Sequence, residues 1–126
     1  MRGDGSNNVV LRLQTDRAGL SMVLGSLELL IMQALWDADR PPLTNKEIQH
    51  AMSCSGHELS VSATGTTTRR LTEKGLVLET RKDDLYQYTA RFTEDELEFY
   101  VVEQVLARLR HEWPGHFDEL GVRFDG

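Results

Sequence analysis

The stretch Ser60–Arg91 reads SVSATGTTTRRLTEKGLVLETRKDDLYQYTAR, and its first half predicts a polar helix. Ser60 or Ser62 is suited to cap this helix, because a serine oxygen accepts a hydrogen bond from the unpaired N–H groups of the first turn. Gly75 ends the helix, because glycine adopts the left-handed conformation beyond a helix terminus without strain. The pattern therefore predicts a helix over residues 61–74.

The two faces of this helix differ in chemistry. At 100° per residue, Leu71 shares one face with Thr64, Thr67 and Thr68. The other side carries small, hydroxylated and charged side chains, namely Ser62, Ala63, Thr66, Arg69, Arg70 and Glu73. Small side chains permit close approach to DNA, hydroxyls reach phosphates or bases, and arginines reach guanine edges. The outer face therefore has the properties that a major groove admits.

The second half of the stretch predicts a two-stranded hairpin. Leu76–Arg81 and Leu85–Ala90 both alternate apolar with polar residues, which is the pattern of a half-buried strand. Lys82, Asp83 and Asp84 form a tight charged connection between them. A helix, a glycine stop and a two-stranded ribbon resemble the recognition helix and wing of a winged helix-turn-helix.

Two amphipathic helices are expected upstream. Leu24–Ala38 is the first, with Ser26 as a suitable N-cap and the following prolines as its stop. Its apolar stripe consists of Leu27, Leu30, Ile31, Ala34 and Leu35. Thr44–Met52 is the second helix, and Thr44 and Glu47 have the spacing of a capping box. Helix, loop, helix, turn, helix and hairpin is the order of a winged helix-turn-helix domain.

A long helix is expected over Thr93–Trp113. Its apolar face is formed by Leu97, Tyr100, Val101, Val105, Leu109 and Trp113, and Val102 and Leu106 broaden it. At about 1.5 Å per residue this face is some 30 Å long, more than a small winged domain can cover, so we expect it to bind a second copy of the chain. Packing against the chain's own helices is the alternative. The tail contains Phe117, Leu120, Val122 and Phe124, and we expect it to fold back over this interface.

Composition predicts one domain with an appendage. Three regions are expected: a flexible N-terminal extension (1–22), a winged helix-turn-helix domain (23–92) and a helical dimerisation region (93–126). The net charge of −6, taken whole, argues against a nucleic-acid binder. However, residues 93–126 hold nine acidic and three basic residues, whereas residues 44–92 hold six acidic and seven basic residues. Phosphate contact depends on local charge, so DNA binding remains compatible with this sequence.

Several classes of protein are not indicated. There is no apolar run that would span a membrane and no signal peptide, so a cytoplasmic protein is expected. The single cysteine, Cys54, excludes an internal disulfide. His50, Cys54 and His57 are a weak metal motif without a fourth ligand nearby, so no metal or other cofactor is predicted. The sequence lacks a glycine-rich phosphate loop and a nucleophile elbow, so it does not indicate an enzyme.

With these elements in place, the chain resembles the penicillinase-repressor family of bacterial transcription regulators. The resemblance rests on LGSLELLIMQALW (24–36), LTNKEI (43–48), TTTRRLTEKGLV (66–77) and YQYTARFTEDE (86–96). It implies a homodimeric repressor that binds a palindromic operator, with the 61–74 helix in the major groove, the wing on the backbone and residues 94–113 in the dimer. By position, it implies DNA contacts at Ser62, Ala63, Thr66, Thr67 and Arg70. Together with the basic residues nearby, the candidate DNA-binding set is Ser62, Ala63, Thr66, Thr67, Arg69, Arg70, Lys74, Arg81 and Lys82.

The chain also departs from the family pattern. The family often has Gly-Arg at the wing tip, where this chain has Asp83 and Asp84, and two carboxylates there repel phosphate. The family usually has buried valine and leucine at the positions of Thr64 and Thr68, so we expect a weaker apolar contact between this helix and the core. The C-terminal region holds neither the Asn-Phe cleavage site of penicillinase-type members nor the cysteines of the copper-responsive branch.

Two other functions fit the same pattern. The acidic wing tip and the negative net charge are compatible with a winged-helix module that binds protein instead of DNA. A ligand-responsive regulator of another winged-helix family would need a pocket, for which Trp36, Phe99, Tyr100 and Trp113 are the candidate walls. These aromatic residues are equally well explained as core or interface residues.

Overall fold

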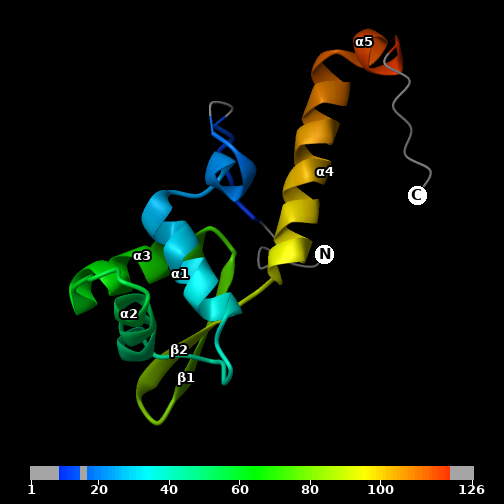
Figure 1. Cartoon of the computed structure of the whole chain (residues 1–126). Helices are drawn as coiled ribbons and strands as arrows, with labels where there is room; N and C mark the ends of the chain where they lie inside the picture. Colours follow the sequence, from blue (N-terminus) through cyan, green and yellow to red (C-terminus); the bar gives the residue numbers. More distant parts are fainter. Residues whose placement is uncertain (1–8, 15–16, 120–126) are drawn as a thin grey trace. The chain divides into compact units, whose positions relative to one another are not determined.

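The computed structural model describes residues 9–14 and 17–119, and Figure 1 shows the order of the elements. The elements are η2 (Gly19–Met22), α1 (Ser26–Trp36), α2 (Asn45–Cys54), α3 (Val61–Glu73), β1 (Val77–Lys82), β2 (Leu85–Ala90), α4 (Glu94–Glu112) and α5 (Pro114–Glu119). The chain divides into two compact units between Glu94 and Asp95. The predicted fold class, mainly helical with one small hairpin and a long C-terminal helix, is confirmed.

Three helices and the hairpin build the core of the first unit. α1, α2 and α3 contact one another, and the hairpin contacts all three helices. Ile31, Met32, Ile48, Leu71 and Leu76 are fully buried at their meeting point. The arrangement is that of a winged helix-turn-helix, in which α3 is held by two helices behind it and the hairpin follows it directly.

The first helix differs from its prediction in its cap and its buried face. Gly25 is the N-cap and Ser26 is the first helical residue, so the predicted Ser26 cap is wrong. The buried face consists of Glu28, Ile31, Met32 and Leu35, and Leu27 is 38% exposed. Ile31 and Leu35 of the predicted stripe are thus buried, with Met32 beside them, whereas the burial of the charged Glu28 is not predicted by hydrophobic periodicity.

The second helix follows its prediction closely. Thr44 is the N-cap: its Oγ1 accepts from the Glu47 N–H at 3.2 Å, and Glu47 Oε1 accepts from the Thr44 N–H at 2.8 Å. These reciprocal bonds confirm the predicted capping box. The helix buries Ile48 and Met52 and continues to Cys54, two residues beyond the predicted end. The capping box therefore fixes the first residue of α2, the helix that packs against α3.

The hairpin is joined by a two-residue turn. Lys82 pairs with Leu85, and the turn residues Asp83 and Asp84 have φ values of 52° and 64°. Two successive positive φ angles match the type I′ turn, whose twist suits a hairpin. Leu43 adds an isolated bridge to Tyr88, with backbone hydrogen bonds of 2.9 and 2.7 Å. A single bridging residue has no periodicity, so the sequence did not predict it.

The described part of the predicted N-terminal extension has one buried side chain, one backbone hydrogen bond to the end of α3 and one within the extension itself. Leu20, in η2, is 7% exposed. The Val10 N–H donates to the Lys74 carbonyl at 3.0 Å, and the Gln14 N–H donates to the Met22 carbonyl at 2.7 Å. Residues 1–8 and 15–16 of the predicted extension lie outside the described residues.

The second unit contains the predicted long helix and a short one. In α4, Leu97 and Val101 are buried, whereas Phe99 and Val102 are 65% and 54% exposed. α5 begins at Pro114, where proline suits the first position of a helix because its missing N–H needs no partner there. The predicted folding back of the tail concerns Phe117, whose side chain is not described, and residues 120–126, which lie outside the described residues. Within the described ranges, no helix has the length and apolar character to cross a membrane.

Candidate nucleic-acid interface

The ends of α3 are fixed by two residues that the sequence indicated. Ser60 is the N-cap, since its Oγ accepts from the Ala63 N–H at 3.0 Å. Gly75 has a φ of 84°, the left-handed conformation that releases the chain from the helix into β1. Val61–Glu73 therefore forms a rigid helix of three and a half turns with a defined start and stop.

One face of α3 is a row of buried threonines. Thr64 and Thr68 are fully buried and Thr67 is 3% exposed. Their hydroxyls donate to the carbonyls four residues earlier, at 2.9, 2.8 and 2.9 Å respectively, so each buried hydroxyl has a hydrogen-bond partner within the helix. Thr67, one of the residues predicted to contact DNA, thus faces the core, and its hydroxyl is already bonded. We leave it out of the proposed DNA contacts.

The opposite face of α3 presents most of the other predicted contacts. Ser62, Thr66, Arg69 and Arg70 are exposed, and Ala63 is half-buried. Neither arginine forms an ion pair with a described residue. Two guanidinium groups and two short hydroxylated side chains therefore lie on one exposed side of the helix, with their hydrogen-bond donors available.

Lys74, also predicted to contact DNA, has a different role. Its Nζ lies 2.7 Å from Glu28 Oε1, and the side chains are 26% and 5% exposed respectively. The same oxygen of Glu28 accepts from the Gly25 N–H at 2.8 Å, while Glu28 Oε2 is buried without a hydrogen-bond partner among the described residues. The ion pair links the end of α3 to the start of α1. Sequence reasoning missed Glu28 because nothing local marks a glutamate for burial.

The wing presents two basic and two acidic side chains. Arg81 Nη2 lies 3.1 Å from Asp84 Oδ1, and the Arg81 guanidinium lies 5.5 Å from the centre of the Tyr86 ring. Lys82 is exposed and forms no ion pair with a described residue. Because the Arg81–Asp84 pair is fully solvated, it is weak and can open in favour of a phosphate. Asp83 and Asp84 together cancel the basic charge of the wing tip.

Tyr88 lies at the junction of the hairpin with the helices. It is buried, and burial raises the pKa of its phenol. A hydrogen bond with Glu79 and the negative charge of that residue raise the pKa further, whereas a hydrogen bond with Asn45 and the charge of Arg69 act in the opposite direction. The proton affinity of this phenol of β2 therefore depends on residues of α2, α3 and β1.

The residues of the weak metal motif do not gather around one point. Cys54 is exposed and its Sγ lies 3.5 Å from His50 Nε2. Over residues 9–14 and 17–119, no group of three His, Cys, Asp or Glu side chains is arranged to hold a metal ion. The four aromatic residues considered as pocket walls also differ in their surroundings: the Trp36 indole donates to the Phe92 carbonyl at 2.8 Å, Tyr100 is half-buried, and Phe99 and Trp113 are exposed.

Comparison with known proteins agrees with this geometry. The family model described as penicillinase repressor matches residues 24–116, which is most of the chain. Two curated proteins called transcriptional regulator BlaI, from Mycobacterium tuberculosis strains CDC 1551 / Oshkosh and ATCC 25618 / H37Rv, are each 32% identical over 85 residues. Each similarity covers 68% of this chain and 60% of the relative's length.

Proposed function

The chain belongs to the penicillinase repressor family, and on this premise we propose that it is a DNA-binding transcriptional regulator, a homodimeric repressor of a palindromic operator. Each α3 enters a major groove, and each wing lies along the neighbouring phosphate backbone. Its partners are double-stranded DNA and a second copy of the chain, and it acts in the cytoplasm. It regulates transcription and catalyses no reaction.

The observation that carries this proposal is the division of α3 into two faces. The threonines and Leu71 hold the helix against the core, while Arg69 and Arg70 remain exposed and unpaired among the described residues. An arginine can form two hydrogen bonds to guanine or contact phosphates, and the short Ser62 and Thr66 let the helix approach the groove floor.

Dimerisation is proposed through the exposed face of α4, which keeps Leu109 and Trp113 of the predicted dimer set and adds Val102 and Leu106 from the margin of the predicted apolar face. Leu97 and Val101, two members of the predicted set, are already buried in the chain, and Tyr100 is half-buried. The apolar side chains that remain accessible recur at alternating spacings of three and four: Phe99, Val102, Leu106, Leu109 and Trp113. This spacing is that of a two-helix seam, which supports pairing with α4 of a second copy.

A fluorescence-anisotropy titration tests the proposal directly. The purified chain is titrated against duplex DNA from upstream of its own gene and against a shuffled duplex, at two salt concentrations. We expect specific binding at two chains per site that weakens as salt rises, because phosphate contacts release counterions. Equal affinity for both duplexes would refute the proposal that the chain recognises a specific operator sequence. Absence of binding at low salt would favour the protein-interaction module, for which the exposed carboxylates of Asp83 and Asp84 are the supporting observation.

Arg70→Ala is expected to weaken operator binding roughly tenfold to a hundredfold, equivalent to about 1–3 kcal/mol. Its stability in urea is expected to stay within about 0.5 kcal/mol, because the residue is exposed and forms no ion pair with a described residue. Arg108→Ala in α4 is the matched control, since it removes an equal charge from an exposed residue of the second unit, where Arg108 pairs only with Glu112 of its own helix. An Arg70 variant that binds operator as tightly as the control would remove this residue from the interface.

The double substitution Asp83→Asn and Asp84→Gly at the wing tip is expected to raise both the free energy of unfolding and the affinity for DNA. Asn-Gly is favoured where both turn residues have positive φ, so the free energy of unfolding should rise by about 0.5–1 kcal/mol. Removal of two carboxylates should tighten DNA binding at low salt roughly threefold and steepen its salt dependence. The control, Glu98→Gln with Glu103→Gln, makes the same change in net charge on α4. A wing variant that gains stability but binds like this control would show that the wing does not approach DNA.

A further inference from the structure

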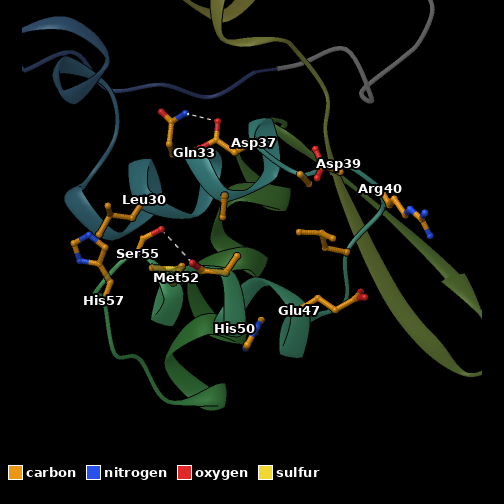
Figure 2. Close-up of a pocket in the computed structure, with 14 residues that line it drawn as sticks. Leu30, Gln33, Asp37, Asp39, Arg40, Glu47, His50, Met52, Ser55 and His57 are labelled. Atoms are coloured by element: carbon orange, nitrogen blue, oxygen red, sulfur yellow. Dashed lines mark hydrogen bonds between the residues drawn. The ribbon is translucent and has the colours of Figure 1, made fainter.

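A groove runs across the first unit between the second half of α1 and α2. It has a volume of about 570 Å³, which lies within the 300–1,000 Å³ typical of small-molecule sites. Figure 2 shows α1 with Gln33 and Asp37 on one side and α2 with Glu47 and His50 on the other. None of the aromatic residues considered as pocket walls from the sequence lines it.

The lining of this groove is apolar at its centre. The apolar members come from both helices and the loop between them: Leu30, Ala34, Ala38, Leu43, Ala51 and Met52. Met52 is buried, while Leu30, Ala34 and Ala51 are half-buried, so the groove floor already belongs to the core. Alanines leave the space open, and a methionine adapts its shape to what lies above it.

Carboxylates dominate the charge around this apolar floor. Asp37, Asp39 and Glu47 line the groove and are exposed, and none of them forms an ion pair with a described residue, although Glu47 Oε1 accepts from the Thr44 N–H at 2.8 Å. Asp37 Oδ1 accepts from Gln33 Nε2 at 3.0 Å, so this carboxylate is held at the edge of the groove by its own helix. Arg40 is the only Lys or Arg among the lining residues, and Figure 2 shows its side chain pointing away from the groove.

From this combination we infer that the α1–α2 groove binds a small amphipathic organic cation, with its apolar part on Ala34, Ala51 and Met52 and its charge near Asp37 and Glu47. The apolar floor supplies the non-directional part of the affinity, since burying a ligand's hydrocarbon surface there removes it from water. The unpaired carboxylates select positive over negative charge. The inference does not depend on the proposed DNA function, because no residue of the α3 or wing contacts lines the groove.

The structure also argues against two other occupants. A metal ion lacks a ligand set, because three suitable side chains do not converge within the described ranges. A small anion would meet three carboxylates and only one outward-pointing arginine. A basic peptide shares the favourable charge, and it is therefore distinguished by experiment.

The test is a titration of the full-length ¹⁵N-labelled chain with benzyltrimethylammonium, followed by amide chemical shifts. We expect saturable shifts confined to the groove, at residues such as Ala34, Asp37 and Ala51. Phenylacetate, of similar shape and opposite charge, should give no saturable shift, and the neutral benzyl alcohol should bind more weakly than the cation. A cation that shifts only residues elsewhere, or equal affinity for the neutral compound, would overturn the inference.

Two variants sharpen the test. Asp37→Asn with Glu47→Gln should weaken cation binding roughly five- to tenfold, because two attractive charges are lost while the Glu47 cap is retained by glutamine. Glu98→Gln with Glu103→Gln is the matched control and should bind like the unmodified chain. Ala34→Leu places a larger side chain of α1 in the groove and should abolish saturable binding of the cation. The amide spectrum of the variant should still be that of the folded protein. Undiminished affinity in both groove variants would refute the site, as would a lysine-rich peptide that saturates the groove when benzyltrimethylammonium does not.

Discussion

Lys74→Met is expected to lower the free energy of unfolding by about 2–3 kcal/mol, a large share of the stability of a domain of this size. The reason lies in Glu28, whose carboxylate is 5% exposed and has Lys74 Nζ as its charged partner at 2.7 Å. Methionine replaces the packing of the lysine stem but leaves a buried negative charge without compensation. The value is below that of a fully buried pair because Lys74 retains 26% exposure and is partly screened by water.

Urea denaturation of a double-variant cycle measures this effect. Glu28→Gln removes the buried charge while keeping an oxygen for the Gly25 N–H, so Glu28→Gln with Lys74→Met should recover most of the lost stability. The coupling between the two changes should be at least about 1 kcal/mol. If Lys74→Met instead left stability unchanged and weakened operator binding, Lys74 would be a DNA contact, as the sequence alone predicted.

Val102→Glu combined with Leu109→Glu is expected to weaken the homodimer at least a hundredfold, equivalent to about 3 kcal/mol. Both positions lie on the exposed apolar face of α4, and in a symmetric pair each substitution places two like charges in one desolvated seam. Sedimentation equilibrium over a range of concentrations measures the dissociation constant. Operator binding should weaken together with dimerisation, because only two chains joined in a dimer can occupy both half-sites of an operator as one unit.

The matched control for this prediction is Gln104→Glu with Ala107→Glu. Both residues are exposed in α4 and lie off the apolar face, so the control adds the same charge without entering the seam. The dissociation constant of this control dimer should remain within roughly threefold of that of the unmodified chain, since exposed charges outside the seam contribute little to the free energy of association. A Val102–Leu109 variant that sediments as a dimer at the same concentrations as this control would assign dimerisation to another surface.

The features that the sequence predicted well are local ones. The capping box at Thr44 depends on a spacing of three residues, and the end of α3 depends on one glycine, so neither requires knowledge of the rest of the fold. The threonine face of α3 also follows from helical periodicity alone, because Leu71 fixes which side is buried. Periodicity of two likewise predicted both strands within one residue of their observed ends.

The features that it did not predict join residues far apart in the chain. The partners in the Glu28–Lys74 pair are 46 residues apart, and this contact pairs a buried glutamate of α1 with a lysine that the sequence placed among the DNA contacts. Val10 likewise reaches the Lys74 carbonyl from a segment whose composition suggests flexibility. In the candidate interface, helical periodicity already placed Thr67 on the buried face and Arg70 on the exposed one, and the structure agrees, so the DNA contact that the family resemblance implied at Thr67 is the part that does not fit.

The hydroxyl bonds of Thr64, Thr67 and Thr68 all return to carbonyls of the same helical segment. These bonds therefore fasten the helix to itself and leave mainly methyl groups to meet the helices behind it. The contact of these three threonines with the rest of the core therefore depends on how well their shapes fit together, and not on hydrogen bonds to another helix. The hydrogen bonds of this face are complete within the helix, whatever packs against it.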